Sequence, residues 1–382
     1  MPPGAPSPGA PNPYGPPPTQ PAPPHAQPQF ARPQYGQAPP PAGGWTAPPK
    51  PGLIPLRPLT LGVILGASFQ VLRRNPRPTF GFALGIQSAI MLLTLVITGL
   101  VTFAALSRVF TASAADTDEV GAGTLAIILL STLIPGVLSL VAAALVQGIL
   151  MLEIQRATLG EKLKLKQLWR RARGRLGALV GWMFLLTAAL LVGIAVLVLL
   201  IVLLVTLGTV GVALAVVVGI FGGGALLVAA VWIGTKVSLV PSVLMGERLS
   251  LKDAVSRSWS LVGGYFWRTF GIQLLVATIL SVAMQVVSVP IQLIAPMAVF
   301  LVDPNGTMGP VTVVILGVIY LLSILVILVV SSITLVVQSA ATGLIYIDLR
   351  MRKEGLDLDL ARFVEEQSTG QISPDPYLVD RP

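Results

Sequence analysis

The sequence has no cysteine in its 382 residues, and its only histidine is His25. The absence of cysteine excludes disulfides, thiolate metal sites and a cysteine nucleophile. One histidine in a proline-rich segment argues against histidine-based acid–base or metal chemistry. Charged residues make up only 11% of the chain, against about 25% in soluble proteins. We therefore expect a membrane protein that is not an enzyme and binds no metal or cofactor.

Much of the chain consists of long hydrophobic runs without charged residues. No side chain is charged between Leu176 and Thr235, and about 20 apolar residues suffice to cross a bilayer. That run therefore predicts two spans joined by a tight turn. By length and hydropathy the chain has six predicted spans, which are 79–106, 122–151, 177–206, 209–236, 269–301 and 311–346.

The basic residues predict the orientation of these spans, because loops rich in Lys and Arg stay in the cytoplasm. With both termini cytoplasmic, Arg108 is the only basic residue in the three outer loops. The opposite orientation would carry the basic clusters across the membrane. The net charge of +9 is then explained by topology and by anionic lipids at the cytoplasmic face, and nucleic acid is not an expected partner.

The two ends of the chain differ in composition from the predicted membrane domain, residues 57–366. Residues 1–56 hold most of the 33 prolines and are predicted to form a disordered cytoplasmic tail. Such a tail either binds a proline-recognising protein partner or serves as a simple tether. Residues 367–382 are predicted to form a second disordered cytoplasmic tail.

A Leu-x-Leu motif recurs before the hydrophobic runs and near the C-terminus, with Thr60, Lys164, Ser250 or Asp357 in the middle. Thr60, Ser250 and Asp357 are predicted helix N-caps, because Ser, Thr and Asp accept a hydrogen bond from a free backbone N–H. The leucine before each cap has the spacing of a hydrophobic staple. The motif therefore predicts amphipathic interfacial helices near 60–74, 164–176, 250–263 and 357–366.

These elements together predict an all-α integral membrane protein built from internal repeats. Its six transmembrane helices form three tandem units, each an interfacial amphipathic helix followed by a transmembrane hairpin. The fourth interfacial helix closes the membrane domain.

Two sets of polar side chains are candidate functional residues. Basic side chains on the interfacial helices either contact anionic lipid phosphates or only determine topology; they are Arg73, Arg74, Arg77, Arg170, Arg171, Arg173 and Arg175. Glutamines within the spans either form interhelical hydrogen bonds or line a polar substrate path; they are Gln87, Gln147, Gln273 and Gln338.

Residues 55–365 resemble a group of actinobacterial polytopic membrane proteins named for a glycerophosphoryl diester phosphodiesterase membrane domain. The segments that carry the resemblance are "RPLTLGVILGASFQVLRRNP", "LWRRARGRL", "RSWSLVGGYFWRTFG" and "GLIYIDLRMRKEGLDLDL". The resemblance implies kinship of the membrane region alone. The phosphodiesterase domain of that group relies on histidines and acidic metal ligands, and this chain lacks such histidines.

The sequence and the resemblance together predict a non-enzymatic multi-pass protein of the bacterial plasma membrane. We expect a scaffold or accessory module at the cytoplasmic face, linked to lipid or envelope processes. The alternative is a transporter or permease for a lipid-like or amphipathic substrate. The sequence does not indicate an oligomeric state.

Overall fold

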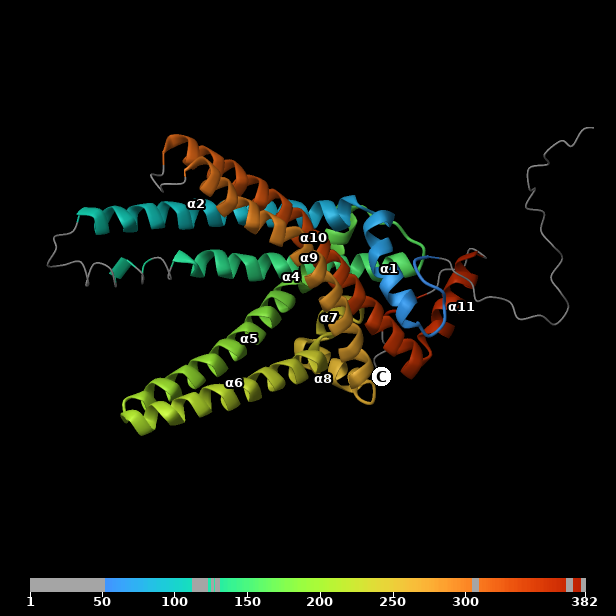
Figure 1. The fold of residues 1–382 in the computed structure, drawn as a ribbon. Helices are drawn as coiled ribbons and strands as arrows, with labels where there is room; N and C mark the ends of the chain where they lie inside the picture. The colour runs from blue at the N-terminus through green and yellow to red at the C-terminus, as the bar shows by residue number, and fades with distance from the viewer. Residues whose placement is uncertain are drawn as a thin grey trace, which may run out of the picture. The chain divides into compact units, whose positions relative to one another are not determined.

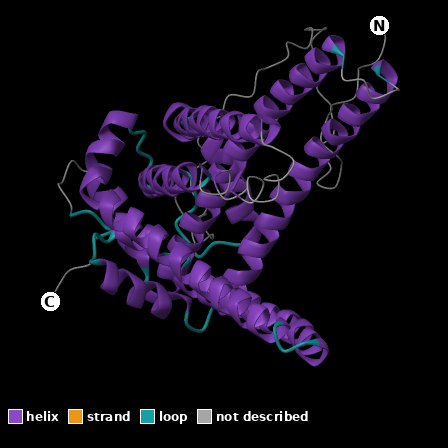
Figure 2. Cartoon of the chain, turned by 90° about the vertical axis from the view of Figure 1, so that its left-hand side faces the viewer, coloured by secondary structure: helices purple, strands orange, loops and turns teal. Residues whose placement is uncertain are grey.

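The computed structural model describes residues 52–111, 123–124, 127, 131–303, 309–368 and 374–378. These residues form helices and loops, with no strand among them (Figure 2). The helices are α1 (Leu61–Arg74), a π-helix η1 (Arg77–Gly81), α2 (Phe82–Thr111), α4 (Leu133–Thr158), α5 (Leu165–Val205), α6 (Thr209–Val237), α7 (Val240–Gly246), α8 (Leu251–Val262), α9 (Phe266–Val302), α10 (Pro310–Glu354) and α11 (Leu356–Ser368).

Within the described residues, six helical stretches are long and apolar enough to cross a membrane, as many as the sequence predicts. They are Arg77–Ala105, Leu133–Thr158, Leu165–Val205, Thr209–Gly246, Phe266–Val302 and Pro310–Glu354. The chain is thus a multi-pass membrane protein. Residues 122, 125–126 and 128–130 of the second predicted span lie outside the described residues.

The long helices pack in consecutive pairs, α2 with α4, α5 with α6 and α9 with α10. Figure 1 shows these three hairpins extending from one end of the membrane domain, where the short helices gather. The most apolar stretches of α5 and α10 bury none of their residues inside the protein. Surfaces of this kind suit contact with lipid tails. We call these outer parts of the three hairpins the arms.

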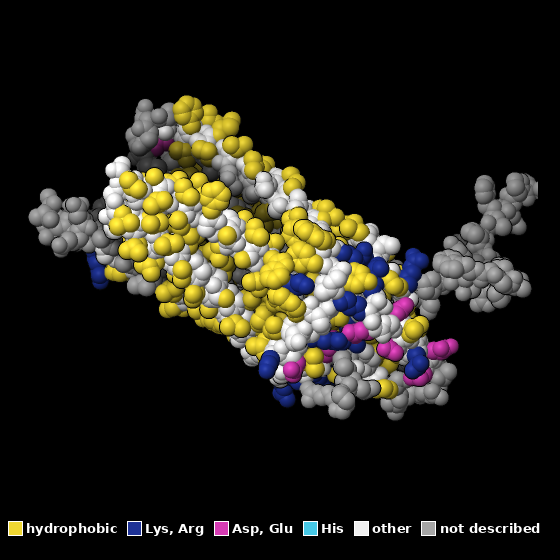
Figure 3. All heavy atoms as spheres, turned by 90° about the horizontal axis from the view of Figure 1, so that it is seen from below, with side chains coloured by type: hydrophobic (Ala, Val, Ile, Leu, Met, Phe, Trp, Pro, Cys, Tyr) yellow, Lys and Arg dark blue, Asp and Glu magenta, His cyan; other side chains and the backbone are white. Residues whose placement is uncertain are grey.

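The opposite end, which we call the base, comprises α1, α7, α8, α11 and the adjoining ends of α4, α5, α6, α9 and α10. Its core includes Ile149 and Ile154 of α4, Leu168 of α5 and Tyr346 of α10, all fully buried. Figure 3 shows the same division: hydrophobic side chains cover the arms, and Lys, Arg, Asp and Glu gather at the base.

The short helices follow the predicted positions with one difference. Helices α1, α8 and α11 form near 60–74, 250–263 and 357–366. The predicted helix 164–176 is not separate, because α5 continues from Leu165 to Val205 without interruption. The apolar run that follows Leu176 contains no proline to break the helix, so the amphipathic segment and the span form one element.

The three predicted caps also differ from one another. Ser250 Oγ accepts a hydrogen bond from the Asp253 backbone N–H at 3.3 Å and donates to Asp253 Oδ2 at 2.6 Å. Thr60 holds the N-cap position of α1 but makes no side-chain capping bond. Asp357 lies inside the first turn of α11 rather than before it, because the left-handed Gly355 (φ 69°) lets α11 begin at Leu356.

Parts of the two predicted tails pack on the base. Leu53 and Ile54 are buried, and the Leu53 backbone N–H donates to the Ala157 carbonyl at 2.9 Å. Near the C-terminus, Tyr377 is buried, its hydroxyl contacts Thr158, and Asp375 pairs with Arg156. Residues 1–51, 369–373 and 379–382 lie outside the described residues.

Candidate functional site: an arginine-lined hollow at the base

Five arginines line a hollow of about 430 Å³ at the base. Arg170, Arg171, Arg173 and Arg175 come from the first turns of α5, together with Gly174, and Arg248 comes from the loop between α7 and α8. The buried face of α5 carries Leu168, Ala172 and Leu176 at a spacing of four. That spacing places the intervening arginines on the remaining faces of the helix.

Only one of these guanidinium groups has a protein partner among the described residues. Arg175 Nη1 donates to the Leu249 carbonyl at 2.7 Å, which ties α5 to the loop before α8. The side chains of Arg170, Arg171, Arg173 and Arg248 make no hydrogen bond or ion pair within the described part of the chain. Guanidinium groups of this kind bind oxyanions through paired N–H donors.

Arg248 has an unusual backbone conformation. It is the one residue other than glycine with a positive φ, 55°, in the described chain. The equivalent left-handed positions after α4 and α10 are Gly160 (φ 84°) and Gly355 (φ 69°), as is usual at helix C-termini. An L-residue with a side chain costs about 1–2 kcal/mol in this conformation.

The neighbours of Arg248 hold this conformation in place. Glu247 is buried and accepts hydrogen bonds from Tyr346 Oη and from Arg257 Nε, both at 2.9 Å. On the other side, Leu249 is held by Arg175. Burial lowers the pKa of Arg257, but Glu247 and then Glu354 raise it, and the net result is a pKa above the ordinary arginine value.

The network around Glu247 extends into α10. Arg350 Nη1 donates to Tyr346 Oη at 3.1 Å, and Arg350 Nε donates to Glu354 Oε2 at 3.0 Å. Glu354 also pairs with Arg257 at 2.7 Å. These bonds lock α8 and the α7–α8 loop onto α10.

A second network surrounds Asp348, a buried carboxylate of α10. Its Oδ1 accepts the Leu59 backbone N–H at 2.7 Å, and its Oδ2 accepts Arg268 Nη2 at 3.0 Å. Arg352 Nε donates to Oδ1 at 3.0 Å. Arg268 and Arg352 both donate to the Leu59 carbonyl as well, at 2.8 and 3.0 Å. The segment before α1 is therefore fixed to α9 and α10.

The remaining predicted arginines lie outside the hollow. Arg73 and Arg77 are exposed at the end of α1 and in η1. Arg74 is half-buried, and its Nη2 lies 3.5 Å from the Glu161 carbonyl. The structure thus brings together four of the seven predicted arginines and adds Arg248, which sequence reasoning missed. The segment "GERLSL" gives no sign that its arginine takes a left-handed backbone.

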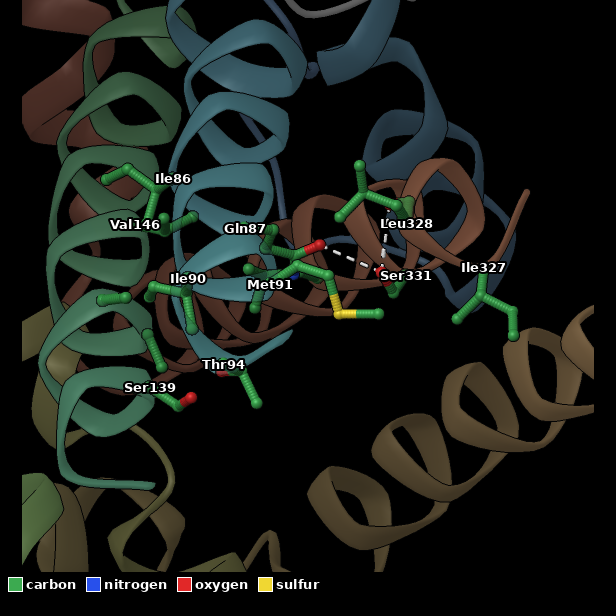
Figure 4. Close-up of a pocket in the computed structure, with 13 residues that line it drawn as sticks. Ile86, Gln87, Ile90, Met91, Thr94, Ser139, Val146, Ile327, Leu328 and Ser331 are labelled. Atoms are coloured by element: carbon green, nitrogen blue, oxygen red, sulfur yellow. Dashed lines mark hydrogen bonds between the residues drawn. The ribbon is translucent and has the colours of Figure 1, made fainter. Parts of the chain in front are cut away.

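The glutamines occupy different environments. Gln87 Oε1 accepts a hydrogen bond from Ser331 of α10 at 3.0 Å (Figure 4). It also accepts one from Ser332 of α10 at 2.8 Å. Gln273 Nε2 donates to Ser238 Oγ at 2.8 Å. Gln147 Oε1 is buried without a partner in the described chain. Gln338 is exposed on α10. Gln87 and Gln273 therefore link helices.

Gln87 also lines an apolar pocket of about 340 Å³ between α2, α4 and α10. Figure 4 shows Ile90 and Met91 of α2, Ser139 and Val146 of α4 and Ile327 of α10 around it. A second pocket of about 510 Å³ lies between α9 and α10 and contains Gln292 and Tyr320. Both pockets lie along helices that are apolar enough to span a membrane.

No family model matches this chain, and neither a curated protein nor a solved structure is significantly similar to it. Within the described ranges, no three His, Cys, Asp or Glu side chains come together in a group that could hold a metal ion. The hollow, the networks and the pockets are therefore the features that bear on function.

Proposed function

We propose that the chain is a non-enzymatic scaffold or accessory module of the bacterial plasma membrane. Its base lies at the cytoplasmic face, close to lipid or envelope processes, and both termini are cytoplasmic. The three hairpins are three tandem units, each introduced by an amphipathic segment. The resemblance to the actinobacterial membrane-domain group fits this proposal.

The main support for the proposal is that all three hairpins meet in one charged base. Glu247, Asp348 and Glu354 are engaged by arginines that join separate helices. Carboxylates held in this way serve as structural links between elements. A base built from such links presents one fixed surface, which suits a module that positions partners at a membrane.

The experiment is a pull-down from membranes with the full chain and with a variant lacking Met1–Ala47. This deletion leaves Leu53 and Ile54 in their buried positions on the base. We expect a protein partner that the full chain retains and the truncated chain loses. Equal capture by both would contradict recruitment through the tail, and metal-dependent phosphodiesterase activity of the purified chain would contradict a non-enzymatic role.

The pocket beside Gln87 favours a second candidate, a transporter for a lipid-like or amphipathic substrate. The pocket is mostly apolar, and its polar groups include Gln87 and Ser331. Apolar walls with a few placed polar groups are typical of ligand sites. Proteoliposomes with a fluorescent phospholipid test this candidate. Transport predicts flux that Gln87→Leu abolishes and Gln338→Leu, outside the pocket, leaves intact; no flux in the unmodified chain would refute it.

A further inference from the structure

The arginine-lined hollow lies where α5 enters its apolar stretch. Arg175 is the last charged residue before the uncharged run from Leu176 to Thr235. Trp169, on the same helix, is 42% exposed, and tryptophan concentrates at the interface between membrane and water. In a bilayer these positions bring the hollow to the depth of the lipid headgroups.

The charge in the hollow is not balanced by the protein. No carboxylate occurs among the described residues that line it. Elsewhere in the base, Arg257, Arg268 and Arg350 each pair with a buried acid. Those three arginines therefore have carboxylate partners, whereas Arg170, Arg171, Arg173 and Arg248 have none in the described chain. Guanidinium groups crowded without a counter-charge repel one another until an anion joins them.

The left-handed backbone of Arg248 is a second, independent observation. Strained residues that the surrounding structure holds in place cluster at binding sites. Glycine takes the same conformation without strain at Gly160 and Gly355. Arg248 thus occupies a backbone conformation that favours glycine, and its side chain lines the hollow.

We propose that this hollow binds the phosphate group of an anionic lipid headgroup, with Arg248 closing the site against the α5 arginines. A phosphomonoester fits best, since it carries a charge of about −1.5 to −2 at neutral pH and offers several acceptor oxygens to paired guanidinium donors. This inference rests on the proposed function, because it needs the base to lie against an anionic lipid surface.

The test uses the full chain in detergent micelles, titrated with micelles that carry phosphatidic acid, with binding measured by thermophoresis. The hollow variant is Arg170→Gln/Arg173→Gln. The matched control is Arg73→Gln/Arg77→Gln, which removes the same charge beside another span. Arg175 is left intact because it holds Leu249.

We expect the hollow variant to lose about 25-fold in affinity, about five-fold per arginine, and the control to lose less than about two-fold. An equal loss in both variants would overturn the proposal, because it would show that general surface charge attracts the lipid. An unmodified chain that does not bind phosphatidic acid would overturn it as well.

Arg248→Gly separates binding from folding. Glycine accepts the left-handed backbone, so we expect an unchanged or higher melting temperature together with an affinity reduced by about five-fold. A lower melting temperature with unchanged affinity would show that Arg248 serves the fold, against the proposal. Gly174→Glu is a second check, because a Cβ there meets no atom within 4 Å and the added carboxylate should block the hollow.

A parallel titration with inorganic phosphate alone identifies the source of the phosphate group. We expect much weaker binding than to phosphatidic acid, and equal binding would overturn the assignment to a lipid. The lipid titration and the pull-down test different proposals. If the chain binds phosphatidic acid but recruits no partner, the lipid site in the hollow is supported and the scaffold function is contradicted.

Discussion

The base and the arms of this protein are held together by different interactions. In the base, buried carboxylates such as Glu247 and Asp348 join helices that are distant in sequence. In the arms, apolar side chains face outward, and Leu199 is 69% exposed. Helices in lipid gain little from hydrophobic association and rely on close packing. The charged links between the three hairpins therefore lie in the base, and Gln87 adds a polar link between α2 and α10.

Close packing in the arms is visible between α5 and α6. A Cβ added at Gly222 would lie 2.7 Å from Leu197 Cδ1, and one at Gly193 would lie 2.9 Å from Leu226 Cδ1. Small residues let the two helices approach. These contacts lie within one hairpin, whereas the networks of the base join different hairpins. Changes in the base should therefore disturb more of the molecule than changes in the arms.

The largest expected effect comes from Glu247→Ala. The substitution leaves Arg257, Arg350 and the Tyr346 hydroxyl without their buried acceptor, and removing one partner from such a pair costs about 3–5 kcal/mol. Unfolding in detergent, followed by tryptophan fluorescence, measures the loss. Leu199→Ala in the exposed arm is the control and should change the free energy of unfolding by less than about 0.5 kcal/mol. Similar losses in both would remove the distinction between base and arms.

The next effect concerns the C-terminal segment on the base. Tyr377→Ala removes a buried ring that packs against Thr158, and truncation of a large aromatic side chain costs about 3 kcal/mol or more. We expect carboxypeptidase to digest past position 377 in this variant and to stop before Tyr377 in the unmodified chain. Equal digestion of the two proteins would show that the segment contributes nothing to the base.

The same segment should respond to alkaline pH. Burial raises the pKa of Tyr377, although Thr158 and Arg350 act in the opposite direction. When the C-terminal segment is released from the base, the Tyr377 hydroxyl has an ordinary pKa of about 10. In the packed segment its pKa is higher, so it keeps its proton at a pH at which the released hydroxyl begins to lose it. The contribution of Tyr377 is therefore complete below pH 10 and is lost as pH rises further. Carboxypeptidase digestion should accelerate above pH 10, and Tyr377→Phe should weaken this dependence.

The smallest effect comes from the helix caps at the edge of the base. Ser250→Ala removes the hydrogen bond to the Asp253 N–H and should cost about 1 kcal/mol of unfolding free energy. Thr60→Ala is the matched control, because Thr60 makes no side-chain capping bond and its loss should be close to zero. Equal losses in the two variants, measured by the same fluorescence assay, would contradict this difference.

Hydropathy was sufficient to locate the six spans, because each is a long apolar run with charges near its ends. Local spacing was also sufficient for the cap at Ser250. The networks of the base could not be predicted, since Glu247 and Arg350 are far apart in sequence and meet only in the folded chain. Arg248 was missed for a similar reason: its left-handed backbone depends on Glu247 and Leu249 being fixed by distant partners.

Membrane orientation tests the central claim most directly, that the arms cross the membrane and the base lies in the cytoplasm. The chain has no cysteine, so single cysteines give an unambiguous signal. Ser256→Cys lies at an exposed position of α8 in the base, and Thr206→Cys lies at the exposed end of α5 in an arm. A membrane-impermeant maleimide should label position 206 in intact cells and position 256 only after permeabilisation. The reverse pattern would contradict the account.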